Sequence, residues 1–406
     1  MPISSIINKT VYLVFLLLII LQLHNAVSLP INRGFDAQAH LDYVHFLKTQ
    51  KRIPLPTDGW EMYQPPLYYL VLAALSSSGY IPILRFFEWG VFIIITYIFL
   101  RKTDAPNSFR LPTAMLISCL PVIIYMSLSV GNEFFSTIFI SLALIYYQIS
   151  INSKNLIRFA ILGIVLGIGL LAKSTTLMII LCITINEFVR GHKKPKDLAK
   201  TLGVMLGIIF LVAGWFYVRN LFLYHNPLAA ASDFPRQFPL LQSKIPLSSG
   251  FFLNLKPFLT MDLFQAQYYS FIGGTYFSWF YDGHNIIIPP QAFSKAGMFI
   301  VALSIPIFII GLKGYFLELK KVTYKNRVLL LYPLLLIISY FLYFLKLPFY
   351  STVKGAFLVS LAIPFGYFFL KEISLLQRYG SIICFYIVIY CLLIIKNFWI
   401  LKSWYR

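Results

Sequence analysis

Just after the first apolar stretch of the chain, a carboxylate and an imidazole stand at helical spacing. In the run Gly34-Phe35-Asp36-Ala37-Gln38-Ala39-His40, Asp36 and His40 are four residues apart, so a helix places them on one face. Side chains so placed can share a proton or hold a cation, and a divalent metal ion is left open as a cofactor. Asp36 also fits a structural role as a helix cap. Ala39 stands where a capping box needs glutamate or glutamine, which favours the chemical role.

A second carboxylate, Glu133, follows Gly131 and Asn132 and is expected in the first turn of a membrane helix. Asn132 is a good helix cap, and a glutamate near a helix N-terminus is stabilised by the helix dipole. This pattern fits a structural role and a functional role equally well. A carboxylate at membrane depth is costly unless it faces a wet cavity, so Glu133 is a candidate functional residue.

Three cations stand at predicted span ends on the same side as these acids: Lys173, Arg219 and Lys354. Facing one cavity, they would suit a lipid phosphate, because phosphate oxygens accept hydrogen bonds from several donors. The alternative for each is a side chain that extends along the membrane to the headgroups.

Aromatic residues dominate the two long segments between predicted spans, at about 30–82 and 218–293. In the run Tyr63-Gln64-Pro65-Pro66-Leu67-Tyr68-Tyr69, the two prolines predict the start of a helix that is too short to span. We expect it in the membrane interface, with its tyrosines at headgroup depth and Tyr63, Gln64 and Tyr68 contacting substrate or interface. The run Trp279 to His284 suits sugar binding or membrane anchoring, and anchoring explains most of its aromatics.

Composition and hydropathy predict the elements that position these residues. Of 406 residues, 59% are hydrophobic and 12% charged, far from the roughly one quarter charged of soluble proteins. We therefore predict an all-α polytopic membrane protein with about eleven transmembrane helices, interfacial helices in the first outer loop, and one domain over 1–406. The first span is expected around the apolar run 11–21, and the others at about 83–100, 111–129, 134–150, 157–172, 175–189, 202–218, 294–312, 328–345, 352–370 and 380–396.

The placement of the basic residues predicts the orientation. The short connections and the N-terminus hold 18 of the 34 Lys and Arg residues and five of the 14 acidic ones, a net charge of +13. Short basic connections mark the cytoplasmic face. The net charge of +20 thus indicates topology rather than nucleic-acid binding. The protein is expected in the inner or plasma membrane, with its functional residues on the non-cytoplasmic face.

The first apolar segment has two interpretations, and the cysteines indicate no chemical role. Lys9, the apolar run 11–21 and Ala26-Val27-Ser28 fit a cleaved signal peptide or a retained span, and retention is favoured because the segment leads into the functional loop. The four cysteines lie inside predicted spans and are expected to be small buried hydrophobic residues.

In order along the chain, several motifs resemble those of GT-C-fold membrane glycosyltransferases of the protein O-mannosyltransferase and aminoarabinose transferase type. They are the 34–40 run, Leu55-Pro56, the 63–69 run, Glu133 after Gly-Asn, Lys173 after Leu-Ala, and Arg219-Asn220 after aromatics. This resemblance implies transfer of a sugar from a polyprenyl-phosphate donor to a hydroxyl of a glycan, lipid or protein acceptor, usually with inversion. Many relatives carry two adjacent acids where this chain has Asp36-Ala37, which leaves metal binding open.

An inverting transfer needs a base for the acceptor proton and cations for the leaving phosphate. We expect Asp36 as base or acceptor-orienting carboxylate, Glu133 or His40 as its partner, and the three cations as donor-phosphate contacts. A lipid or solute transporter and a non-catalytic scaffold are the alternatives. Transporters usually place charges near the bilayer midplane, whereas the span interiors here are expected to be nearly free of charge.

Overall fold

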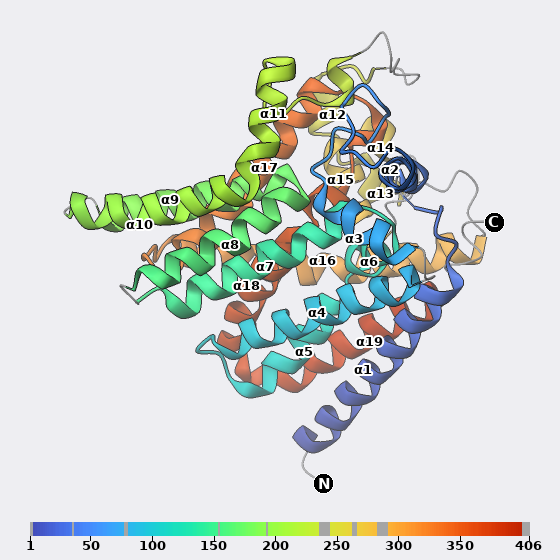
Figure 1. Cartoon of the computed structure of the whole chain (residues 1–406). Helices are drawn as coiled ribbons and strands as arrows, with labels where there is room; N and C mark the ends of the chain where they lie inside the picture. The colour runs from blue at the N-terminus through green and yellow to red at the C-terminus, as the bar shows by residue number, and fades with distance from the viewer. Residues whose placement is uncertain are drawn as a thin grey trace.

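The computed structural model describes residues 3–34, 36–76, 80–152, 155–191, 194–234, 244–261, 266–281 and 291–399. Most of these residues are helical, and none lies in a strand (Figure 1). This confirms the predicted all-α class. The helices are α1 (Ile3–Ser28), α2 (Ala37–Gln50), α3 (Leu67–Ser76), α4 (Ile81–Arg101), α5 (Asn107–Ser118), α6 (Pro121–Leu128), α7 (Asn132–Ser150), α8 (Leu156–Ala172), η1 (Ser174–Thr176), α9 (Leu177–Gly191), α10 (Pro195–Ile209), the π-helix η2 (Phe210–Gly214), α11 (Trp215–Tyr224), η3 (Ala231–Asp233), α12 (Ser249–Phe252), α13 (Lys256–Thr260), α14 (Ala266–Tyr269), α15 (Phe271–Phe280), α16 (Gln291–Leu319), α17 (Arg327–Lys346), η4 (Tyr350–Thr352), η5 (Gly355–Leu361), α18 (Ala362–Leu375), η6 (Gln377–Tyr379) and α19 (Gly380–Phe398).

Membrane spans account for most of these helices. Within the described residues, nine helical segments are long and apolar enough to cross a bilayer. They are Lys9–Ser28, Ile81–Arg101, Asn132–Ser150, Ser174–Gly191, Pro195–Tyr224, Lys295–Leu319, Arg327–Lys346, Tyr350–Leu375 and Gln377–Phe398. The bent pair α5 and α6 is a tenth candidate, and α8 is apolar but shorter, at 17 residues. Each predicted span therefore corresponds to one helix or to consecutive helices, and a multi-pass membrane protein is confirmed.

A proline explains the bend between α5 and α6, whose axes differ by 51°. Pro121 disfavours helical geometry at Leu120, which is extended, so α5 ends and a new helix starts at the proline. The bend brings the turn after α6 against the residues before α2. There, a Cβ on Gly34 would lie 2.6 Å from Ser129 Oγ, and Gly34 has a φ of +122°, so the close approach requires glycine.

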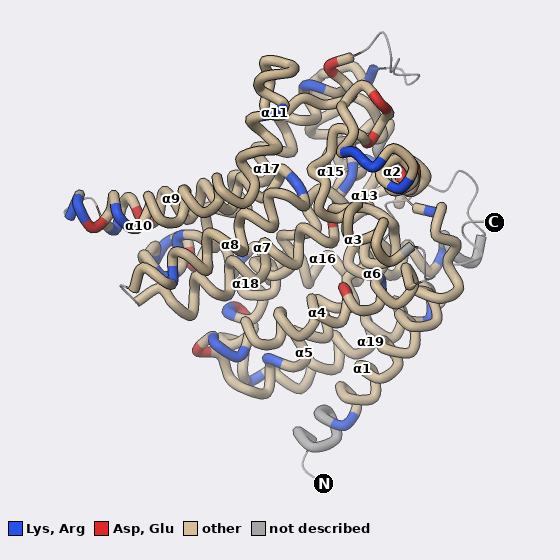
Figure 2. The backbone as a smooth tube through the Cα atoms, in the orientation of Figure 1, with Lys and Arg blue, Asp and Glu red and all other residues tan. Residues whose placement is uncertain are grey.

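Charged residues are segregated along the bundle. In Figure 2, Lys and Arg gather where α8, α9 and α10 end on the left and where α4 connects to α5, whereas the tube between is nearly all uncharged. The elements of the two long loops, including α2 and α12 to α15, lie toward the other end (Figure 1). The spatial separation of the basic connections from the long loops is therefore visible in the fold. Their assignment to the cytoplasmic face stays a prediction.

The first helix packs as an integral part of the bundle. Val14, Leu18 and Leu21 of α1 are at most 1% exposed, and α1 runs beside α4 and α19. At its end, Asn25 Nδ2 donates to the carbonyl of Phe398 at 3.1 Å. This packing agrees with a retained span. The four cysteines are buried free thiols, as expected.

Two charged residues in α4 correct the expectation of nearly charge-free span interiors. Arg85 and Glu88 lie in the first two turns of α4 and are 3% and 5% exposed. Arg85 donates to the carbonyl oxygens of Leu29 at 3.0 Å and Ile31 at 3.4 Å. These bonds satisfy backbone groups left free where α1 ends, so Arg85 fixes the path of the chain toward Asp36.

Candidate functional site

Asp36 immediately precedes α2 but does not cap it. Its φ of 49° places the backbone in the left-handed region, and its side chain makes no capping hydrogen bond to the helix. The capping alternative is therefore wrong, and so is the expectation that Asp36 lies within the helix. Its carboxylate is exposed beside α2. The helix itself was predicted at 36–49 and is observed at Ala37–Gln50.

His40 lies one turn into α2 and is buried, with only 3% exposure. Its Nδ1 hydrogen-bonds the hydroxyl of Tyr69 at 2.8 Å. A Cβ on Gly131 would lie 3.4 Å from His40 Nε2 and 3.2 Å from Glu133 Oε2, so both atoms line the same small space. Burial lowers the pKa of His40, and the nearby carboxylates of Glu133 and Asp36 only partly oppose this. The imidazole is therefore neutral near pH 7, able to accept or relay a proton.

Glu133 forms an ion pair with Lys173. Glu133 Oε1 and Lys173 Nζ are 2.6 Å apart, with side chains 18% and 10% exposed. Lys173 Nζ also donates to Asn132 Oδ1 at 3.1 Å. The Asn132 amide donates in turn to Gln64 Oε1 and to the carbonyl of Ala172, both at 3.0 Å. This chain of bonds joins the starts of α7 and η1 to the loop before α3 and fixes the ammonium position.

Glu61 belongs to the same site, although no motif or spacing in the sequence indicates it. It is 6% exposed, and its Oε2 accepts from Gln64 Nε2 at 3.0 Å, while the same amide donates to the Tyr63 hydroxyl at 2.9 Å. Burial, together with the nearby Asp36 carboxylate, raises the pKa of Glu61 to about 8. Glu61 is therefore mostly protonated at pH 7.

The titration of Glu61 predicts a pH-dependent stability. Because its pKa is raised on folding from about 4.5, the folded chain holds a proton that the unfolded chain releases. This contribution is complete below about pH 4 and is lost as the pH rises through about 8. Glu61→Gln keeps an acceptor for Gln64 and does not titrate.

Melting temperatures measured in detergent between about pH 5 and 9 should therefore fall less for Glu61→Gln than for the wild type. Asp104→Asn, which removes an exposed carboxylate in the connection between α4 and α5, should follow the wild type. Parallel curves for Glu61→Gln and the wild type would contradict the assignment.

The aromatic residues around the site are mostly buried. Tyr68 is 3% exposed, and its hydroxyl accepts from the backbone N–H of Gly131 at 3.0 Å. The Tyr43 and Tyr69 rings stack with centroids 3.8 Å apart. Tyr68 and Tyr69 therefore contact protein rather than lipid headgroups, because α3 packs against α2, α4 and α8, and their depth in the membrane stays a prediction. In α15, Trp279 is likewise 8% exposed, so it packs inside the bundle rather than anchoring it; His284 lies outside the described residues.

The three predicted cations, Lys173, Arg219 and Lys354, do not share one set of partners. Lys354 precedes η5, near enough to Asp36, Glu61 and Glu133 to interact electrostatically. Arg219 instead donates to the carbonyl of Pro54 at 3.1 Å and lies over the Phe216 ring at 5.0 Å. The interactions of Arg219 within the described residues thus hold the loop before α3. Lys173 and Lys354 both interact with Glu133, and a cavity shared by the three cations stays a prediction.

We name the gathered residues the α2–α7 cluster: Asp36, His40, Glu61, Glu133, Lys173 and Lys354. A pocket opens beside the Glu133–Lys173 ion pair, between α7, η1 and η5, and contains about 250 Å³ of space that no atom fills, its open side included. The lining combines hydroxyls with apolar groups: Ser136, Thr137, Ile140, Thr175, Ala356, Phe357, Val359 and Ser360.

A divalent metal finds no evident ligand set here. Across the described residues, no group of three or more His, Cys, Asp or Glu side chains is arranged to hold a metal ion. His40 Nδ1 is bound to Tyr69, and its Nε2 faces Gly131, so the suggested Asp36 and His40 pair does not fit as a metal site.

No protein-family model matches the chain, and no curated protein matches its sequence.

Proposed function

We propose that the protein is a membrane glycosyltransferase that moves a sugar from a polyprenyl-phosphate donor to an acceptor hydroxyl on the non-cytoplasmic face. One observation carries this proposal: acids and cations from separate parts of the chain gather at one end of the bundle, beside a pocket. Asp36 supplies an exposed carboxylate that does not cap its helix, and Lys173 supplies an ammonium held beside the pocket. A base and a cation are the two groups that transfer from a phosphate donor needs.

In the proposed reaction, Asp36 accepts the proton of the acceptor hydroxyl as its oxygen attacks the anomeric carbon of the donor. The bond between that carbon and the phosphate oxygen breaks, and its electron pair stays on the phosphate. Lys173 and Lys354 stabilise the charge that develops there. A single displacement of this kind inverts the anomeric centre.

Glu133 and His40 support these groups. Glu133 holds the Lys173 ammonium at 2.6 Å, which fixes its position before the donor binds. His40 is neutral and lies between Glu133 and Tyr69, where it can orient the acceptor or relay the proton from Asp36. Arg219 positions the loop that carries Glu61 and Gln64 rather than contacting the phosphate.

A transporter would move the donor across the membrane without cleaving it. One assay distinguishes this function from sugar transfer. Purified protein in lipid nanodiscs is incubated with a labelled polyprenyl-phosphate sugar and a mixture of hydroxyl acceptors. Catalysis should release free polyprenyl phosphate in proportion to labelled product. A protein that moves the intact donor across liposomes without cleaving it would contradict the proposal.

A further inference from the structure

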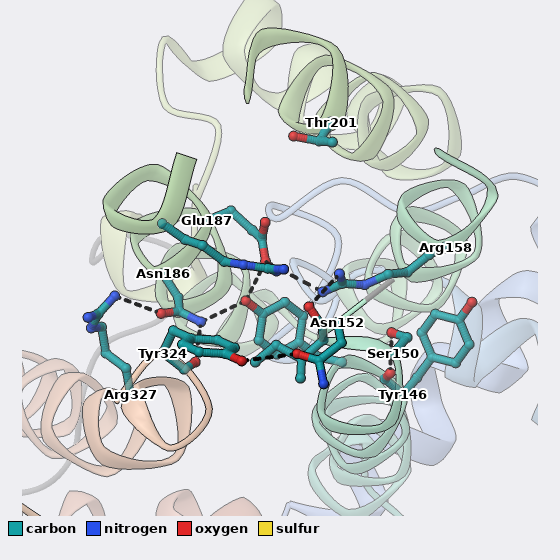
Figure 3. A network of polar contacts seen from close by, with 12 residues as sticks. Tyr146, Ser150, Asn152, Arg158, Asn186, Glu187, Thr201, Tyr324 and Arg327 are labelled. Atoms are coloured by element: carbon teal, nitrogen blue, oxygen red, sulfur yellow. Dashed lines mark hydrogen bonds and ion pairs between the residues drawn. The ribbon is translucent and has the colours of Figure 1, made fainter. Parts of the chain in front are cut away.

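At the end of α7 opposite the α2–α7 cluster lies a second polar network (Figure 3). The Tyr147 hydroxyl donates to Glu187 Oε1 at 2.6 Å, and Asn186 Nδ2 donates to the same hydroxyl at 2.7 Å. Arg158 Nη2 lies 3.4 Å from Glu187 Oε1, and Arg327 Nη1 donates to Asn186 Oδ1 at 2.9 Å. Four helices, α7, α8, α9 and α17, thus contribute side chains to one network.

The network contains more positive than negative charge. Arg190 also reaches Glu187, at 3.5 Å, so two guanidinium groups share one carboxylate at long distances. Arg327 meets an amide rather than a carboxylate. The nearby Glu318 is engaged by Asn326 and the Tyr367 hydroxyl. Three guanidinium groups and one carboxylate leave a local excess of positive charge.

Two of these cations stand at the wrong end of a helix dipole. Arg158 is the third residue of α8, and Arg327 is the first residue of α17. Backbone N–H groups at a helix N-terminus carry partial positive charge, which disfavours cations and favours anions. The α17 N-terminus also has no side-chain cap from Asn326. Charge and dipoles together therefore favour a bound anion.

The length of α7 is that of a membrane span, so a network at its end would lie near the lipid headgroups. The 19 residues of α7 rise about 28 Å at about 1.5 Å each, close to the roughly 30 Å of a bilayer's hydrocarbon layer. The side of the network nearest the surface is accessible, since Tyr324 is 37% exposed and the Arg190 side chain 28%. Glu187 and Asn186 behind it are buried.

We propose that this arginine network, formed by Arg158, Arg190 and Arg327 around Asn186 and Glu187, binds the phosphate of an anionic phospholipid in the leaflet opposite the α2–α7 cluster. Arg190 and Arg327 supply the donors. The contact with Asn186 occupies one of the five N–H donors of Arg327, and a guanidinium matches phosphate geometry. Arg158 and Glu187 hold these groups in place. Basic pockets between membrane helices at the cytoplasmic side bind such headgroups.

The test uses the full chain in detergent, titrated with phosphatidylglycerol, phosphatidylcholine or inorganic phosphate at matched ionic strength, with thermal unfolding as the readout. Wild type should be stabilised by phosphatidylglycerol and not by the other two. Arg190→Gln/Arg327→Gln should weaken the apparent lipid affinity about tenfold or more. Lys321→Gln/Lys325→Gln removes the same charge from exposed positions in the same connection and should retain wild-type affinity.

Equal stabilisation by both lipids, or equal lipid affinity in the two double variants, would overturn the proposal. Stabilisation by inorganic phosphate alone would assign the site to a soluble phosphate instead of a lipid. Arg190→Lys gives a second test if the double variant does not fold, because it keeps the charge and loses the planar fork. Its affinity for phosphatidylglycerol should fall below that of the wild type, and an unchanged affinity would contradict binding through guanidinium geometry.

Discussion

Asp36→Asn should reduce sugar transfer by about 10²-fold to 10⁴-fold, the usual contribution of a general base, while protein level and melting temperature stay those of the wild type. The local structure around Asp36 explains why transfer should fall while stability does not. The Asp36 side chain makes no cap hydrogen bond, so folding loses no such contact with the change. Asparagine also tolerates the positive φ at this position as well as aspartate does.

The matched control is Asp42→Asn, which removes a second carboxylate from α2. Asp42 is exposed and accepts from Gln38 at 2.9 Å, outside the α2–α7 cluster. Its variant should transfer sugar at the wild-type rate. The readout is release of polyprenyl phosphate per mole of folded protein. Wild-type transfer by Asp36→Asn would remove Asp36 from the chemistry, whatever its effect on stability.

The membrane spans were predictable because the thickness of the bilayer sets the length of apolar sequence that each span needs. Any helix that crosses it needs about 20 apolar residues, and that run is read directly from the chain. The α2 helix and the proline start of α3 were predictable from local signals as well, since Pro65 and Pro66 lie just before Leu67. Burial of the tyrosines was not, because it depends on how α3 packs against its neighbours.

Glu61 and Arg219 show why the candidate site was only partly predictable. Glu61 stands in an irregular loop, where no periodicity indicates which side chains face inward, and its burial arises from packing against residues distant in sequence. Arg219 and Lys173 look alike in sequence, each a cation at a span end. Their partners, the Pro54 carbonyl in one case and the Glu133 carboxylate in the other, exist only in the folded chain.

The arginine network was not predicted, because membrane topology already explained its basic residues. Basic residues in short connections are expected from topology, so Arg158, Arg190 and Arg327 had an explanation before the structure was known. Topology requires charge at the surface, however, and does not require Arg158 to be 3% exposed. Glu187 and Asn186, adjacent at the end of an apolar span, are the sequence feature that could have indicated a buried network.

The Glu133–Lys173 ion pair is expected to affect both protein stability and sugar transfer. A double-mutant cycle of Lys173→Met, Glu133→Gln and the double variant Glu133→Gln/Lys173→Met separates the two effects. Lys173→Met should destabilise the protein by about 3 kcal/mol, since it leaves the largely buried Glu133 carboxylate without its cation. Glu133→Gln should destabilise it less, because the amide oxygen still accepts from Lys173. The double variant should be more stable than Lys173→Met alone, as no unpaired charge remains.

Transfer should behave differently from stability in the same cycle. If Lys173 stabilises the leaving phosphate, both variants without it lose transfer, by about 10²-fold or more, and the regained stability of the double variant does not restore it. Glu133→Gln keeps the ammonium with a looser partner and should keep part of its activity. The measurements are thermal unfolding and polyprenyl-phosphate release on the same samples. Recovery of transfer together with stability in the double variant would instead show that the ion pair only holds α7 against η1, and the phosphate contact would have to pass to Lys354.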